Sequence, residues 1–140
     1  MQVSKNFVLE EFIPKEFYNY WKESAIWFID PKIVTIAQWF HDYLNKGIII
    51  NNWHVGGMFN ESGLRDFKTS TGAEFSQHKY GRAIDIKCTG MTGDDLRDIV
   101  KKNVKDLMAI GLTTIELKTS TWLHCDCRYT NSSQLLYVNP

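Results

Sequence analysis

Residues 76–86 of this chain are Ser76-Gln77-His78-Lys79-Tyr80-Gly81-Arg82-Ala83-Ile84-Asp85-Ile86, and residues 122–126 are Trp122-Leu123-His124-Cys125-Asp126. His78, Asp85 and His124 supply two imidazoles and one carboxylate, a three-ligand set that holds zinc and leaves a fourth position for water. An open fourth position is typical of a catalytic zinc site, whereas structural sites are closed. The sequence therefore predicts one zinc ion per chain at these three side chains.

The spacing between His78 and Asp85 also predicts the local fold. They are seven positions apart, so in one continuous strand their side chains would face opposite sides. We expect a turn at 79–81, where Gly81 allows the backbone angles that a turn needs. Asp85 then lies in a strand over 82–88, between two isoleucines, where a buried carboxylate is costly unless a metal or a partner neutralises it. Taken alone, Asp85 could equally face solvent from an edge strand, and the two histidines favour ligation.

Composition places the chain among ordinary globular proteins. Its 140 residues suit one domain, 1–140, with one sizeable core. Lys+Arg and Asp+Glu both total 16, so the chain lacks the basic excess of a nucleic-acid binder. The N-terminus lacks the pattern of a signal peptide, and no apolar stretch is long enough to span a membrane. We expect a monomer made in the cytoplasm, with no nucleic-acid or membrane partner.

Three cysteines, Cys88, Cys125 and Cys127, cannot form an even disulfide framework. We interpret them as reduced, buried, small apolar residues. The alternative for Cys125 and Cys127 is a Cys-x-Cys metal site, but no second cysteine pair completes it.

Periodicity and capping signals predict an α+β fold. Asp30 and Pro31 begin a helix that we expect Gly47 to end. Thr92 and Asp95 form a capping box for another helix, which we expect to continue to Gly111. The remaining expected elements are a short helix over 14–24, strands over 48–50, 82–88, 112–117 and 122–129, and a functional loop over 51–72. This order predicts a small, mostly antiparallel sheet with flanking helices.

Both quoted motifs resemble the zinc-binding motifs of the D-alanyl-D-alanine carboxypeptidase and L-alanyl-D-glutamate endopeptidase family. The family includes bacteriophage endolysins and is distantly related to the zinc domain of hedgehog proteins. The segments 6–12 (Asn-Phe-Val-Leu-Glu-Glu-Phe) and 60–65 (Asn-Glu-Ser-Gly-Leu-Arg) are similar to family segments as well, with Leu64 in place of an aromatic residue. The resemblance runs from about Asn6 to Arg128. It implies a hedgehog-like zinc peptidase fold, one Zn²⁺ held by His78, Asp85 and His124, and cleavage of peptidoglycan peptides.

By the same motif match, Arg65 and Ser76 are candidates for binding a substrate carboxylate. A guanidinium binds a carboxylate through two parallel hydrogen bonds, and peptidoglycan stem peptides carry free carboxylates. The alternative for Arg65 is a solvated loop residue. Ser76 could instead bond only the local backbone in a turn.

The expected catalytic base is where the chain departs from its relatives. Many members have an acid three residues before the last histidine, and Thr121 occupies that position here. Glu116 lies eight residues before His124, so both face one side of a hairpin if the turn is centred on Ser120. We expect Glu116 to be the base and Asp126 to orient one of the zinc-binding residues without binding the zinc itself. Asp126 is the rival base, and the loop acids Glu61, Asp66 and Glu74 are more distant alternatives.

The sequence thus predicts a zinc metallopeptidase acting on peptidoglycan peptides, most simply a phage lytic enzyme that reaches the cell wall after release or is carried in a virion. The alternative is a zinc-stabilised virion or wall-binding module without catalysis, which the missing acid at Thr121 keeps open. A third possibility, an intracellular carboxypeptidase or dipeptidase on D-Ala-D-Ala ends, differs only in substrate.

Overall fold

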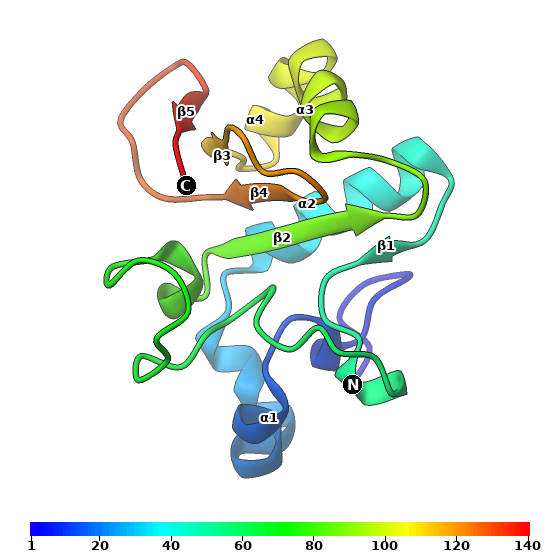
Figure 1. Ribbon diagram of the computed structural model, residues 1–140, viewed down its shortest axis with the longest axis vertical. Coiled ribbons are helices and arrows are strands. Elements are labelled where there is room, and N and C mark those ends of the chain that lie inside the picture. The colour runs from blue at the N-terminus through cyan, green and yellow to red at the C-terminus, as the bar shows by residue number, and fades with distance from the viewer.

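A five-stranded mixed sheet with the order β1-β2-β4-β3-β5 forms the centre of the computed structural model, which describes residues 1–140 (Figure 1). The strands are β1 (Ile48–Ile49), β2 (Ala83–Cys88), β3 (Thr114–Glu116), β4 (Leu123–Asp126) and β5 (Leu136–Val138). β1–β2, β2–β4 and β3–β4 are antiparallel, and β3–β5 is parallel. The α+β class is therefore confirmed, and β5 with its parallel pairing was not predicted.

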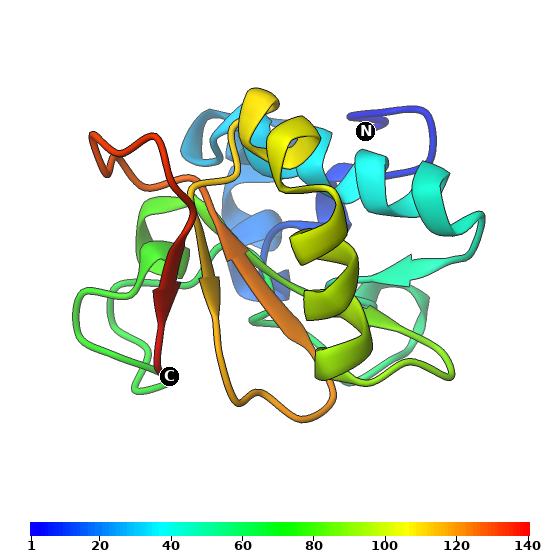
Figure 2. The same ribbon diagram turned by 90° about the horizontal axis from the view of Figure 1, so that it is seen from above.

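The two faces of the sheet differ in chemistry because side chains alternate along each strand. One face is apolar and belongs to the hydrophobic core, through Ile84, Ile86, Ile115, Leu123 and Cys125. Helix α2 (Pro31–Leu44) packs against β1 and β2, and α3 (Gly93–Lys102) packs against β4. Figure 1 shows α2 behind the sheet, and Figure 2 shows α3 beside β4. The other face carries Asp85, His124 and Glu116, the residues on which the predicted site depends.

Helix α2 begins as predicted and ends earlier than predicted. The Asp30 side chain accepts a hydrogen bond from the Lys32 amide at 3.0 Å, and Pro31 occupies the first turn. The expected stop at Gly47 is wrong, because Asn45 already takes the left-handed conformation with φ 49°. Asparagine tolerates this region better than most residues, so it ends the helix two positions before the glycine.

The predicted helix up to Gly111 is interrupted. Its capping box is confirmed: the Thr92 hydroxyl accepts from the Asp95 amide at 3.1 Å, and the Asp95 carboxylate accepts from the Thr92 amide at 2.7 Å. At Asn103 the helix breaks, and α4 (Val104–Ala109) follows. The Asn103 side chain donates to the Ile99 carbonyl at 2.9 Å. Such side-chain bonding to the backbone competes with helix continuation and accounts for the break.

The N-terminal third consists of short helices. A 3-10 turn, η1 (Leu9–Glu11), precedes α1 (Lys15–Trp21), for which Pro14 is the N-cap. Where we expected α-helix up to Ser24, the chain instead continues as a 3-10 helix, η2 (Lys22–Phe28). No helix of the protein is both long and apolar enough to cross a bilayer.

The predicted loop over 51–72 is confirmed, with one 3-10 turn inside it, η3 (Trp53–Val55). Its later part is tied to the sheet. The Asn51 side chain accepts from the Ser62 amide at 2.8 Å, and the Ser62 carbonyl accepts from the Asp85 amide at 2.7 Å. These bonds hold the segment that contains Arg65 alongside β2, which Figure 1 shows in green below that strand.

All three cysteines are free and buried, as predicted. Burial raises the pKa of Cys127 to about 12, so its thiol stays protonated at neutral pH.

Candidate metal centre

Three elements bring the predicted ligands together. His78 lies in the 3-10 helix η4 (Gln77–Tyr80), whose N-cap Ser76 accepts from the His78 amide at 3.4 Å. Gly81 then turns the chain with φ +66°, which confirms the turn expected between His78 and Asp85. Asp85 and His124 are direct partners in the β2–β4 register, so their side chains leave the same face side by side.

The three ligand atoms form a small triangle. His78 Nε2 lies 3.1 Å from His124 Nδ1 and 3.3 Å from Asp85 Oδ1, and His124 Nδ1 lies 3.1 Å from Asp85 Oδ1. His78 and His124 are 2% and 3% exposed, and Asp85 is 8% exposed. This group can hold a metal ion.

Proton placement shows why a cation fits there. His78 Nδ1 lies 2.7 Å from the Gly63 carbonyl, which can only accept, so that nitrogen carries the proton and Nε2 presents a lone pair. His124 Nε2 lies 3.0 Å from Asp126 Oδ2 and donates to it, so Nδ1 of the neutral ring presents a lone pair as well. Two nitrogen lone pairs and a carboxylate oxygen then converge with no proton between them, an arrangement that requires a positive charge.

The local electrostatics agree with this requirement. Burial alone would lower the pKa of His124, but its bonds to Asp126 and Asp85 outweigh burial and raise that pKa to about 9. Burial would raise the pKa of Asp85, yet His78 and His124 hold it well below its usual range. Burial lowers the pKa of His78, which keeps that ring neutral. Without a metal, a proton on His124 supplies the positive charge between the three groups.

Asp126 is fully buried behind His124. Its carboxylate accepts from His124 Nε2 and also from Arg128, whose Nε donates to Oδ1 at 2.8 Å. Hydrogen bonds from His124 and Arg128 hold the pKa of Asp126 below its usual value, although burial opposes them. The carboxylate thus faces the nitrogen of His124 that points away from the ligand triangle. This position suits orientation of the imidazole and does not suit proton transfer at a metal.

Arg65 lies at the candidate metal centre, but its guanidinium already makes two hydrogen bonds within the protein. Its Nη2 donates to Asp85 Oδ2 at 2.9 Å, and its Nε donates to the Glu61 carbonyl at 2.6 Å. The side chain is 11% exposed, which contradicts a solvated loop position. Arg65 therefore holds the second oxygen of the candidate ligand Asp85, a role that the sequence did not indicate because it depends on a contact across 20 residues.

Glu116 lies beside the triangle on the opposite flank from Asp85. The β3–β4 register pairs Thr114 with Asp126, so the hairpin is centred on Ser120, as the expected placement of Glu116 required. Continuing the register by one step sets Glu116 across from His124. Its Oε1 lies 4.0 Å from His124 Nδ1, and its side chain is 22% exposed. This carboxylate reaches the ligand atoms and remains open to water.

A cavity of about 420 Å³ opens over the triangle. It contains all three candidate ligands together with the predicted substrate residues and the expected base: Arg65, Ser76, His78, Asp85, Glu116 and His124. Trp122 also lines this cavity, whereas Trp53 and His54 do not. Trp53 instead packs against Tyr18 and donates to the Ile13 carbonyl at 2.9 Å.

The structure adds site residues that the sequence analysis missed. The Gly63 carbonyl fixes the tautomer of His78, and Arg128 holds Asp126. Lys87 lies on the Asp85 face of β2 and donates to the Ser62 hydroxyl at 2.8 Å. Strand alternation from Asp85 could have indicated Lys87, and Arg128 lies only two residues from Asp126, but the contact between Gly63 and His78 spans 15 residues and has no local signal.

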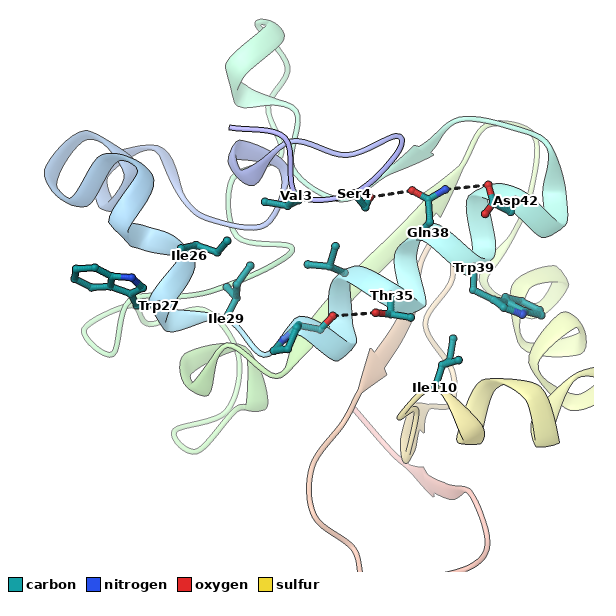
Figure 3. A pocket seen from close by; sticks show the side chains of 12 residues that line it. Val3, Ser4, Ile26, Trp27, Ile29, Thr35, Gln38, Trp39, Asp42 and Ile110 are labelled. Carbon is teal, nitrogen blue, oxygen red and sulfur yellow. Dashed lines mark hydrogen bonds between the residues drawn. The ribbon is translucent and has the colours of Figure 1, made fainter.

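A larger cavity lies elsewhere, beside α2, η2 and the N-terminal segment (Figure 3). Its volume is about 710 Å³, and its walls are mainly apolar, including Ile26, Trp27 and Trp39. The amide of Gln38 also lines it, and Ser4, Asn6 and Asp42 already saturate that amide. This cavity contains no candidate catalytic group.

Neither protein-family models nor curated proteins nor solved structures match this chain. The candidate metal centre therefore rests on the positions of its own residues.

Proposed function

We propose that the chain is a zinc-dependent peptidase that hydrolyses peptide bonds in bacterial peptidoglycan stem peptides. The observation that carries this proposal is the convergence of the ligand atoms of His78, Asp85 and His124 at the base of an open cavity, beside the carboxylate of Glu116. The proposed fold family is that of the D-alanyl-D-alanine carboxypeptidases and hedgehog-like zinc domains, which the quoted motifs resemble.

Zinc is the metal that this donor set fits best. Two imidazoles and one carboxylate are a recurring catalytic zinc set, and three protein ligands leave a position free for water or substrate. His124 is held by Asp126 and His78 by Gly63, an arrangement that is usual for histidines that bind zinc. Bound zinc supplies Lewis-acid chemistry, polarising a carbonyl oxygen and lowering the pKa of a water toward ~7.

The protein's own groups would then perform the remaining steps. Glu116 would accept the proton of the attacking water at a carboxylate oxygen and pass it to the nitrogen of the leaving amine. Asp126 would keep His124 in the tautomer that presents Nδ1 to the metal. Arg65 would keep Asp85 oriented and ionised through its bond to Oδ2. The β3–β4 hairpin holds Glu116 in place beside His124.

The substrate class follows from the resemblance and is compatible with the cavity. Its walls include the side chains of Arg65 and Arg128, which are paired with Asp85 and Asp126 and retain further N–H donors for a substrate carboxylate. Stem peptides carry several carboxylates. Ser76 lines the same cavity while its hydroxyl accepts from the His78 amide, so its hydroxyl proton stays free to donate to a substrate oxygen.

The test is cleavage of purified peptidoglycan by the zinc-loaded protein, with new amino and carboxyl ends identified by mass spectrometry. A chelator should abolish cleavage, added zinc should restore it, and His78→Ala should be inactive. If the protein binds zinc and never cuts peptidoglycan, the alternative of a non-catalytic zinc-stabilised module replaces the peptidase.

A further inference from the structure

Lys87 has a cationic group next to the candidate metal centre that the proposed mechanism does not use. Residues 85 and 87 are two steps apart on β2, so their side chains leave the same face about 7 Å apart. Lys87 lines a second cavity of about 430 Å³. This cavity shares four lining residues with the cavity over the metal centre: Arg65, Thr71, Asp85 and Trp122. The two cavities therefore adjoin at Asp85.

The ammonium of Lys87 has only neutral partners. Nζ donates to the Ser62 hydroxyl at 2.8 Å and to the Asp85 carbonyl at 3.3 Å, and it lies 4.4 Å from the centroid of the Phe59 ring. No carboxylate oxygen lies within the 4.0 Å of an ion pair. An ammonium has three N–H donors, so one remains for a ligand.

A half-buried cation without a counter-charge is unfavourable, and an incoming anion would relieve this cost. Arg65, the neighbouring cation, already donates to Asp85 and to the Glu61 carbonyl. Glu61 lines the same second cavity, and its carboxylate accepts from the Thr71 hydroxyl at 2.6 Å. The cavity thus has two acids, Glu61 and Asp85, of which Asp85 is paired with Arg65, and one cation without an ion pair, so a carboxylate is favoured only beside Lys87.

We propose that Lys87 is a specificity-determining residue that binds a carboxylate on the substrate residue adjoining the bond that is cut. This inference rests on the proposed function. The cavity that Lys87 lines adjoins the cavity over the metal centre at Asp85, so a carboxylate bound by Lys87 lies close to the bond that is cut. This carboxylate belongs either to the C-terminus of the adjoining residue or to its side chain.

The test uses binding, so that it has a readout besides turnover. Four probes are compared on zinc-loaded protein carrying Glu116→Gln to suppress cleavage: N-acetyl-L-alanyl-D-glutamate, its α-amide, its γ-amide and its diamide. Dissociation constants are measured by calorimetry or NMR titration. Lys87→Met, which keeps an unbranched stem and removes the ammonium, should weaken binding of the parent probe by roughly 10–100-fold, the range for losing a charged hydrogen bond. The diamide should bind with the same affinity whether or not Lys87→Met is present, and Lys87→Arg should retain most of the affinity for the parent probe.

The two monoamides identify which carboxylate Lys87 binds. The monoamide that lacks this carboxylate should bind more weakly than the parent probe and should not respond to Lys87→Met. Equal effects of Lys87→Met on all four probes, or no effect on any, would overturn the role of Lys87, while cleavage of peptidoglycan would still uphold the proposed function. Absence of both cleavage and probe binding would overturn the two together. Thermal midpoint and zinc content of each variant report on folding, and Lys87→Gln replaces Lys87→Met if the latter does not fold.

Discussion

Oε1 of Glu116 lies 4.0 Å from Nδ1 of His124, the nitrogen that faces Asp85 and His78. The pair spans β3 and β4 on the polar face of the sheet, and no helix packs between them and the cavity. A carboxylate at this position can exchange protons with a water in the cavity without displacing a ligand atom.

Glu116→Gln should lower turnover on peptidoglycan by ~10²–10⁴ while metal content stays at one ion per chain. Glutamine keeps the shape of the side chain but cannot accept a proton at neutral pH. Initial rates and elemental analysis of the same samples measure both quantities. Glu74→Gln is the control, because Glu74 is exposed on the loop before the metal motif. If Glu74→Gln loses most of its turnover while Glu116→Gln keeps full activity, the base is a loop acid and not Glu116.

Metal removal should destabilise the whole domain, because the ligands come from η4, β2 and β4. Zinc at 100 times its dissociation constant adds about 2.7 kcal/mol to the free energy of unfolding. For a chain of this size that corresponds to a rise in thermal midpoint of roughly 5–10 °C. Calorimetry with and without chelator measures the shift, and His78→Ala should show none. Equal midpoints for wild-type protein with and without zinc would contradict metal binding in this site.

Asp126→Asn should lower zinc affinity by about 10–100-fold, the usual loss for a partner that orients a metal-bound histidine. The asparagine amide can still approach His124 Nε2, but it lacks the charge that favours the required tautomer. Competition with a fluorescent chelator measures the affinity. At saturating zinc the variant should retain turnover. A variant with normal zinc affinity and no activity would assign the proton transfer to Asp126 instead of Glu116.

Arg65→Ala should lower zinc affinity as well as weaken substrate binding. The sequence alone led us to expect an effect on substrate only, but the bond from Arg65 Nη2 to Asp85 Oδ2 links it to the metal centre. Arg65→Lys keeps the charge but lacks the guanidinium that reaches both Asp85 and the Glu61 carbonyl. Its zinc affinity and substrate binding should therefore lie between those of the wild type and of Arg65→Ala. Zinc titration and KM on a stem peptide separate the two effects. If Arg65→Ala binds zinc as tightly as the wild type does, Arg65 acts in substrate binding alone.

Local signals predicted the parts of this molecule that depend on neighbouring residues. The capping box at Thr92 and the turn at Gly81 follow from patterns within a few residues, and both are confirmed. The hairpin between 112–117 and 122–129 is also observed, and its centre at Ser120 meets the condition for Glu116 to face His124. The break at Asn103 was missed because helical periodicity continues across it. Strand β5 was missed because it pairs in parallel with β3, a contact without a connecting turn to indicate it.

The same distinction holds within the site. Motif spacing was enough to select His78, Asp85 and His124 as the candidate ligands, which lie together in the structure. Asp126 contacts His124 from two residues away and was indicated by the sequence. Two other orienting groups depend on tertiary contacts: Gly63 reaches His78 across 15 residues, and Arg65 reaches Asp85 across 20. Alternation along a strand gives the face of Lys87 but not its lack of an acidic partner, which only the packing of the loop reveals.

Gly81→Ala should destabilise the fold and weaken metal binding together. Its φ of +66° disfavours any side chain, at a cost of about 1–3 kcal/mol, and a Cβ there would overlap the carbonyl oxygen of Phe28. The Gly81 carbonyl also accepts from the Asp30 amide at 2.9 Å, so a shift would disturb the start of α2. Because Gly81 directly follows η4, the same shift would move His78 out of the ligand triangle.

Gly90→Ala is the matched control, because Gly90 has a similar φ of +80° and a Cβ added there would meet nothing within 4 Å. Gly90→Ala should lose only the stability that the backbone strain costs, and its zinc affinity should not change. Denaturant unfolding and zinc titration of both variants measure the two effects. If Gly81→Ala and Gly90→Ala lose the same stability and both keep full zinc affinity, close packing at Gly81 does not position His78, and the turn serves only to reverse the chain.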